Sequence, residues 1–144
     1  MRNYFPDYAV VAAIDPQTLD DASATSDWAS MADFDYIDFI VNVGATDITV
    51  DAKVQSADDS SGTNNTDIAN LAVTQLTATD DNKQVILRVR SDQLNAGDTH
   101  VAVVVTVGDG TTGAIVSAVG LGFVANYNPA TQSDLASVAE IVNL

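Results

Sequence analysis

Residues 34–55 constrain the fold of this chain more than any other stretch. Two runs in it place an apolar side chain at every second position, and four residues that include Gly44 join them. The shared faces are Ile37, Phe39, Val41 and Val43 in the first run, and Ile48, Val50, Ala52 and Val54 in the second. A period of two is typical of strands buried on one face. We expect an antiparallel hairpin here, with another sheet covering its apolar face.

The rest of the chain supplies further strands separated by turn signals. We expect strands over residues 8–14, 68–76, 84–90, 100–107 and 114–124, with Asp15-Pro16 ending the first and a polar loop over 17–33. Residues 108–113 predict a Gly-rich hairpin turn and not a phosphate loop, because they lack the lysine and lead into a strand. In residues 114–124, Ile115, Val119, Leu121 and Phe123 share one face and Gly120 and Gly122 the other. The glycines indicate a bend or the close approach of another backbone.

This pattern predicts an all-β fold, an antiparallel β-sandwich, with the jelly-roll type favoured over the immunoglobulin-like type. The predicted organisation is an N-terminal arm (1–7), a sandwich domain (8–124) and a C-terminal linker and tail (125–144). Residues 133–144 fit a short helix with one apolar stripe, formed by Leu135, Val138, Ile141 and Val142. We expect this apolar stripe to pack either on its own domain or on a neighbouring subunit.

The charge of the chain limits its partners. The net charge is −15, and of the 20 acidic residues only Glu140 is a glutamate. Aspartate favours turns over helix interiors, which agrees with a β-rich chain. So large a negative charge disfavours nucleic acid and anionic membranes as partners. The absence of cysteine excludes disulfides and thiolate metal sites.

The residues offer little for catalysis, and we expect no enzyme. His100, at a strand start, is the only histidine, so neither a His-based zinc site nor a Ser-His-Asp triad in a G-x-S-x-G turn is predicted. The aspartates lie in polar turns, where the raised pKa that a glycosidase acid needs is not expected. No cofactor is predicted. Residues 56–67 could offer oxygen ligands to Ca²⁺, but they lack EF-hand spacing, and a solvated loop is the preferred interpretation.

Six residues are candidates for binding a protein partner. Arg2, Tyr4 and Phe5 lie in an arm that either frays or docks on a neighbouring subunit. Trp28 stands in the polar 17–33 stretch, where a cap over the core edge is favoured over a ligand platform. Arg88 and Arg90 share one strand face, and they pair either with nearby aspartates or with the acids of a partner.

Three stretches resemble a family of small virion proteins of tailed phages, often encoded beside the major capsid protein. They are FDYIDFIVNVGATDITVDAKVQSADD, then TATDDNKQVILRVR, then VAVVVTVGDGTTGAIVSAVGL, and together they span about residues 34–124. The ATDDNK stretch is the most telling. The strand after it departs from the family pattern, with aliphatic residues and two arginines where relatives carry aromatic and acidic residues.

The resemblance implies a β-sandwich structural protein on the outer surface of the capsid. Its role would be decoration or cement, its partners the major capsid protein and copies of itself, with a trimer favoured. No catalytic residue is carried over. The alternatives are a tail or neck protein of the same fold, and a fibre-associated module with a carbohydrate-binding or adhesive role.

Overall fold

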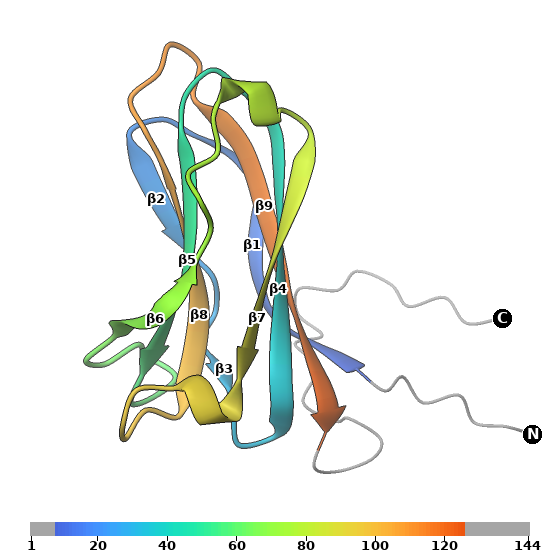
Figure 1. Ribbon diagram of the computed structural model, residues 1–144, viewed down its shortest axis with the longest axis vertical. Helices are drawn as coiled ribbons and strands as arrows, with labels where there is room; N and C mark the ends of the chain where they lie inside the picture. The colour runs from blue at the N-terminus through green and yellow to red at the C-terminus, as the bar shows by residue number, and fades with distance from the viewer. Residues whose placement is uncertain (1–7, 126–144) are drawn as a thin grey trace, which may run out of the picture.

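The computed structural model describes residues 8–125, which form two antiparallel β-sheets packed face to face (Figure 1). Sheet A contains, in order, β1 (Tyr8–Leu19), β9 (Ala114–Ala125), β4 (Phe34–Thr46) and β7 (Lys83–Arg90). Sheet B contains β2 (Ala22–Thr25), β8 (His100–Val107), β5 (Val50–Ala57) and β6 (Thr66–Ala72), and the short β3 (Ala29–Ser30) also pairs with β8. Two 3-10 helices, η1 (Ala78–Asp80) and η2 (Ser91–Gln93), flank β7. The predicted antiparallel β-sandwich is confirmed.

The strand order is that of a jelly roll. Along the chain, successive main strands change sheet except at the β5–β6 pair, which gives β1-β9-β4-β7 opposite β2-β8-β5-β6. The predicted arm (1–7) and C-terminal helix (133–144) lie outside the described residues. Within residues 8–125, no helix has the length and apolarity that crossing a membrane requires.

The hairpin predicted over residues 34–55 is wrong. Its two strands lie in different sheets: β4 pairs with β7 and β9, whereas β5 pairs with β6 and β8. Both strands have a buried face, and these faces meet across the core instead of lying side by side. The glycine-rich 108–113 connection, also predicted as a hairpin turn, likewise leads from β8 in sheet B to β9 in sheet A. Alternation identifies a half-buried strand, but it does not say in which sheet the partner lies.

The N-terminal strands also differ from the prediction. β1 continues through Asp15-Pro16 to Leu19, because the pairing with β9 shifts register between Ile14 and Gln17. Such an irregularity accommodates proline, which has no N–H to donate to the ladder. Part of the polar 17–33 stretch forms β2 and β3, which are short edge strands on β8.

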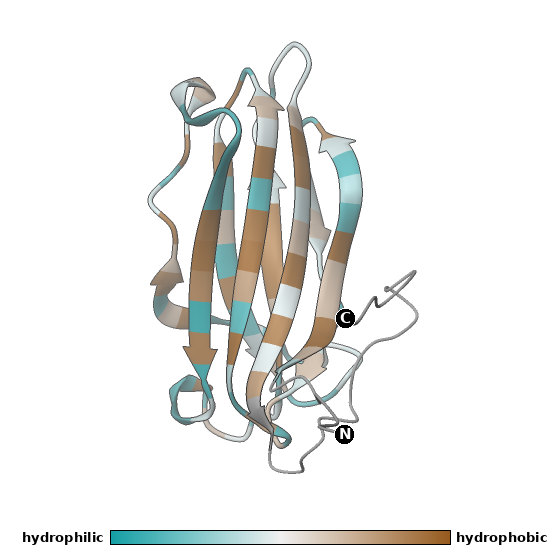
Figure 2. Ribbon diagram, turned by 90° about the vertical axis from the view of Figure 1, so that its right-hand side faces the viewer, coloured by the Kyte–Doolittle hydropathy of each residue, from teal (hydrophilic) through white to brown (hydrophobic). Residues whose placement is uncertain are grey.

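The core lies between the sheets and is built mainly from valine and alanine, with a few larger isoleucine, leucine and phenylalanine side chains. Phe39, Ile37 and Val41 on β4 face valines of β5 and β8, and these side chains have no exposed surface. β9 turns its small side inward: Ala114, Val116, Ala118, Gly120 and Gly122 are buried, whereas Ile115, Val119, Leu121 and Phe123 face outward. Figure 2 shows the many apolar residues along the strands of this sheet.

Two glycines of β9 make room for two aromatic rings of β4. A β-carbon added at Gly122 would lie 2.7 Å from the Phe34 ring, and one added at Gly120 would lie 3.0 Å from the Phe39 ring. The close approach expected at these glycines is therefore an approach of side-chain rings and not of another backbone.

Asp47, in the loop between β4 and β5, binds the loop between β8 and β9. Both loops cross between the sheets at one end of the sandwich. Its carboxylate accepts backbone hydrogen bonds from Thr111 and Thr112 at 2.9 Å and from Gly113 at 3.0 Å. The bond from Thr112 is the main reason that the pKa of Asp47 lies below its ordinary value.

Three other aspartates in loops and at strand ends also have a lowered pKa. Hydrogen bonds from Thr63 lower the pKa of Asp59, and those from Lys53 and then Gln55 lower that of Asp67. Lys83 lowers the pKa of Asp80 to about 2. A group whose pKa is lower in the folded than in the unfolded chain stabilises the fold above its unfolded pKa. That contribution is lost as the pH falls through the folded value.

We predict that Gly122→Ala lowers the free energy of unfolding by about 1–3 kcal/mol, because the Phe34 ring must move to admit the new methyl group. Chemical denaturation measures the change. In the double variant Gly122→Ala/Phe34→Leu, the smaller side chain leaves room, so the loss is expected to be less than the sum of the two single losses. Additive losses would show that the ring does not set the limit at residue 122.

We predict that Asp47→Asn lowers the stability of the chain at pH 7, because a neutral amide accepts the three loop hydrogen bonds less well than a carboxylate. The difference from the wild type should shrink as the pH falls below about 4, where the unfolded carboxyl protonates. Denaturation midpoints at pH 7 and pH 3 measure it. Asp109→Asn changes an exposed residue of the 108–113 loop that Asp47 binds; it gives the same change of charge and should have little effect at either pH.

Candidate interaction surface

The outer face of sheet A is unusually apolar for a sheet face that points away from the core. Strand register arranges its side chains in rows across the four strands, from β1 to β7. The first three rows are Tyr8, Phe123, Tyr36 and Arg90; Val10, Leu121, Asp38 and Arg88; and Ala13, Val119, Ile40 and Ile86. We call these twelve residues the outer face of sheet A, and the third row the aliphatic row. Their charge is carried by two arginines and one aspartate.

Three aromatic rings in the first row form a cluster at one end of the face. Tyr36 stacks on Phe123, with 5.1 Å between ring centroids and an angle of 14° between the planes, and Tyr8 lies 6.0 Å from Phe123. The guanidinium carbon of Arg88 lies 4.5 Å from the centre of the Tyr36 ring, which is a cation–π distance. We call Tyr8, Tyr36 and Phe123 the aromatic cluster.

Arg88 is fixed by Asp38, its cross-strand neighbour on β4. Two parallel bonds join them, Nε to Oδ1 at 2.6 Å and Nη2 to Oδ2 at 2.7 Å. The Asp38 side chain is only 12% exposed, so the pair is partly shielded from water. The bonds from Arg88 to Asp38, followed by the charge of Asp38, raise the pKa of Arg88 above its ordinary value. The bidentate geometry makes this a positioned pair and not a chance surface contact.

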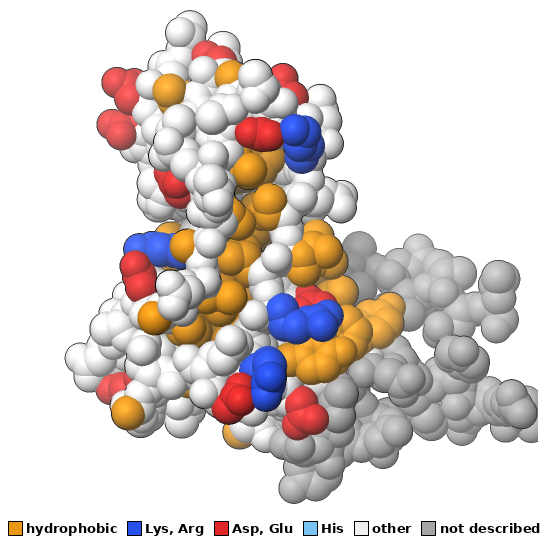
Figure 3. Space-filling model, viewed as in Figure 1, with side chains coloured by type: hydrophobic (Ala, Val, Ile, Leu, Met, Phe, Trp, Pro, Cys, Tyr) orange, Lys and Arg blue, Asp and Glu red, His pale blue; other side chains and the backbone are white. Residues whose placement is uncertain are grey.

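Arg90 is held much less firmly. It contacts Asp92 at 2.8 Å, but both side chains are more than 60% exposed, and exposed pairs of this kind contribute little. The two arginines line a hollow of about 390 Å³ together with Asp35, Tyr36, Ser91 and Asp92. In Figure 3, basic, acidic and apolar side chains lie together at the lower end of this view. Arg90 can therefore exchange Asp92 for a carboxylate of another molecule at small cost.

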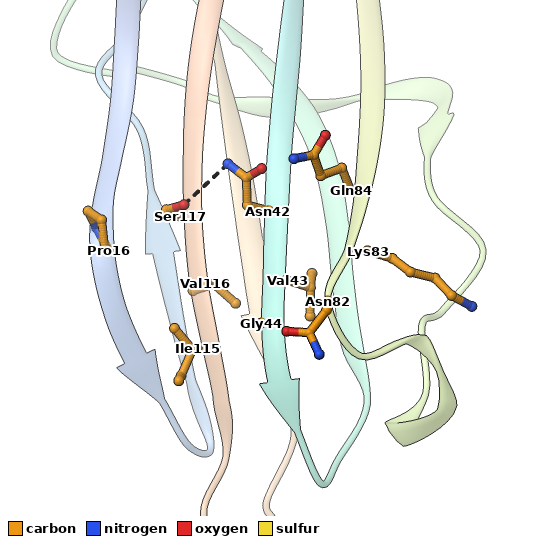
Figure 4. Close-up of a pocket in the computed structure, with 10 residues that line it drawn as sticks. All are labelled: Pro16, Asn42, Val43, Gly44, Asn82, Lys83, Gln84, Ile115, Val116 and Ser117. Carbon is orange, nitrogen blue, oxygen red and sulfur yellow. Dashed lines mark hydrogen bonds between the residues drawn. The ribbon is translucent and has the colours of Figure 1, made fainter.

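A second hollow lies farther along the same sheet. It has a volume of about 290 Å³ and is lined by β1, β9, β4 and β7, with Asn42 donating to Ser117 at 3.3 Å across it (Figure 4). Its lining includes no carboxylate and no imidazole, and the amine of Lys83 is bonded to Asp80. The only ionisable side chain in its lining is therefore that of Lys83.

The structure brings together some of the predicted partner-binding residues. Arg88 and Arg90 both lie on the outer face of sheet A and pair with aspartates, as one of the two interpretations expected. Arg2, Tyr4 and Phe5 lie outside the described residues, but the arm joins the sheet at Tyr8, in the same row as Arg90. The predicted role of these residues in binding a partner stays a prediction.

Trp28 lies elsewhere, just before β3 on sheet B. A side chain at Gly62 would collide with its ring, so the half-buried indole packs on the 58–65 loop. This contact leaves less of the ring available for a sugar than a free platform would, and the expected role as a cap over the core edge stays a prediction.

The other polar candidates are occupied by local contacts. The Nδ1 of His100 lies 2.8 Å from the hydroxyl oxygen of Thr99. In the acidic 56–67 loop, Asp59 accepts from Ser61 and Thr63, and Asp58 accepts from Asn64. Among residues 8–125, no group of three or more His, Cys, Asp or Glu side chains is placed to hold a metal ion.

Sequence reasoning missed the three residues of the aromatic cluster. The period of two in β4 puts Tyr36 on the face opposite the core residues Ile37 and Phe39, but in β9 the larger apolar residues lie on the outer face, which alternation alone does not reveal. The signal was the pair Gly120 and Gly122, because a strand face with no side chains fits opposite large rings. This reasoning predicts that Phe123, on the opposite face of the strand, points outward.

We predict that the two aspartate–arginine pairs differ in their effect on stability. Asp38→Ala should lower the midpoint of chemical denaturation, because it removes both bonds to Arg88 and leaves the guanidinium without its partner. Asp92→Ala, which removes the exposed partner of Arg90, should leave the midpoint nearly unchanged. Equal effects would contradict the distinction between a fixed and an exchangeable arginine.

Comparison with known proteins gives no further guide to this surface. No protein-family model matches the chain, and no curated protein matches it in sequence. Its function has therefore to be argued from its own residues.

Proposed function

We propose that this chain is a virion structural protein of a tailed phage. Its role is capsid decoration or cement: it binds the outer surface of the major-capsid shell as a symmetric oligomer, with a trimer favoured. The sequence resemblance and the observed fold support this proposal. The resemblance covers about residues 34–124, and that stretch contains most of a jelly-roll sandwich, a fold compatible with such a role. Because one fold serves many functions, the choice among them has to be argued from the residues on the surface.

The observation that carries the proposal is the end of sheet A where the aromatic cluster meets Arg90. Tyrosine, phenylalanine and arginine are enriched at protein interfaces, and they often supply most of the binding energy. The predicted N-terminal arm, with Arg2, Tyr4 and Phe5, comes directly before Tyr8 of this cluster in the sequence. The proposed contact with the shell is therefore the aromatic cluster, Arg90 and the arm together.

The charge distribution agrees with a position outside the shell. Each of the four lysines and arginines among residues 8–125 contacts an aspartate, so little positive charge remains available for a phosphate backbone. An acidic protein of this kind fits the exterior of a capsid better than its DNA-facing interior.

Stabilisation of the shell would follow from mass action. A protein that binds the assembled shell and not its separate subunits shifts the equilibrium toward the shell. At a free concentration of 100 times the dissociation constant, the gain is about 2.7 kcal/mol for each site. No chemical step is required, and none is proposed.

We predict that the chain sediments together with expanded capsid shells assembled without it. Arg90→Glu should weaken this binding at least tenfold, about 1.4 kcal/mol, because it places a like charge against an acid of the shell. Lys53→Glu gives the same change of charge on sheet B and should bind like the wild type. A wild-type chain that does not bind at low or moderate salt would contradict the proposed function. Equal binding by the two variants would contradict only the assigned surface.

A further inference from the structure

The outer face of sheet A lacks the polar cover that the other sheet has. In an antiparallel sandwich, the face that points away from the core is normally polar. The outer positions of sheet B are mostly polar, with Ser23, Thr25, Asp51, Lys53, Gln55 and Thr106 beside Ala72, Ala102 and Val104. Among the twelve outer-face residues of sheet A, Ile86 is 65% exposed and Tyr8 46%. A contiguous apolar face of this kind is normally a contact surface.

Both ends of the chain leave sheet A beside this face. β1 begins at Tyr8, which pairs with Phe123, and β9 ends at Ala125, which pairs with Phe34 of β4. Residues 126–144 thus start at the end of the sheet that holds the aromatic cluster. Their sequence offers the apolar stripe Leu135, Val138, Ile141 and Val142.

We propose that residues 126–144, the C-terminal segment, cover the outer face of sheet A of their own chain, with the apolar stripe against the aliphatic row. The lengths allow it. Residues 126–132 span at most about 23 Å when extended, enough to turn back over the sheet. The aliphatic row crosses four strands about 4.8 Å apart, so it spans about 14 Å from β1 to β7. A helix over 133–144 is about 18 Å long and can therefore lie along this row, across the strands.

Charge favours this face over the rest of the surface. The C-terminal segment contains Asp134 and Glu140 and no lysine or arginine, so most of the acidic surface repels it. Among the twelve outer-face residues the only acid is Asp38, and Arg88 offsets its charge. Apolar burial and electrostatics therefore select the same site.

This assignment leaves open the hollow that Arg88 and Arg90 line. That hollow is lined by Asp35, by Tyr36, Arg88 and Arg90 of the first two rows, and by η2, whereas the aliphatic row lies farther along the strands. The C-terminal segment and a partner can therefore share the face. The inference does not depend on the proposed function, because it concerns the free protein.

The absence of cysteine allows a direct test in the full chain. A nitroxide attached to Ser137→Cys, beside the stripe, should broaden the amide signals around Ile40, Ile86 and Val119 in an isotope-labelled chain. It should leave those around Asp51 and Thr106 on sheet B sharp. The reduced, diamagnetic label is the reference. Unbroadened signals on sheet A would overturn the proposal.

A mixed sample separates the same chain from a neighbouring one. Isotope-labelled chains without cysteine are mixed with nitroxide-labelled chains that carry no isotope. Broadening of sheet A in this mixture, equal to that in the single-chain sample, would show exchange between copies and would overturn the assignment to the same chain. Sharp signals in the mixture support it.

A matched pair of variants identifies the contact. Ile86→Lys, at an exposed position of the aliphatic row, should abolish the broadening on sheet A, because it places a charge beneath the stripe. Thr25→Lys adds the same charge at an exposed position of sheet B and should leave the broadening unchanged. The amide spectrum of Ile86→Lys also shows whether the sandwich remains folded. Unchanged broadening in the folded variant would overturn the proposed contact.

Discussion

The packing of two aromatic rings against two glycines decides what this protein shows to its surroundings. Phe34 and Phe39 point inward from β4 and occupy the space over Gly122 and Gly120 of the neighbouring strand. The glycine face of β9 must therefore point inward, and because side chains alternate along a strand, the larger residues must point outward. Val119, Leu121 and Phe123 are exposed to the outside as a consequence of how the core is filled. The apolar outer face of sheet A thus has its origin inside the sandwich.

The few basic side chains of the protein impose a second constraint on its surface. A chain with 20 acidic and five basic side chains has few means to neutralise its own surface. Within residues 8–125 each basic side chain is matched with an aspartate, and Arg88 is matched most firmly, in the middle of the apolar face. Several remaining aspartates bind backbone N–H groups of loops, as Asp47 does, so part of the acidity holds the connections between the sheets in place.

The sequence predicts the strands of this protein far better than it predicts their partners. The inward residues of β4, β5 and β7 follow directly from the period of two, and the turn residues divide the chain at nearly the right places. Which strands pair is a different matter: β4 and β5 are neighbours in the chain but lie in different sheets. Loop chemistry does not distinguish a hairpin from a crossing between sheets when both use glycine and aspartate. Proline at residue 16 was a misleading stop, because a shift of register accommodates it.

The same limit explains why only part of the candidate surface could be predicted. Arg88 and Arg90 stood out because cations are rare in this chain, and that reasoning needs no knowledge of the fold. Tyr36 and Phe123 become neighbours only through the pairing of β4 with β9, and Tyr8 only through that of β1 with β9. A site assembled from four strands of one sheet is invisible until their order is known.

Association of so acidic a protein is governed by where the like charges can be kept apart. Two copies, or a copy and an acidic partner, repel through most of their surface, and salt screens this repulsion beyond roughly 10 Å at 0.1 M. The outer face of sheet A is where the repulsion is smallest, since its twelve residues carry two arginines against one aspartate. It also exposes large apolar side chains, among them Ile86 and Tyr8. The hydrophobic and electrostatic contributions therefore favour the same contact, whichever segment or molecule occupies it. Sheet B offers neither advantage, because its outer positions are mostly polar and include Asp51.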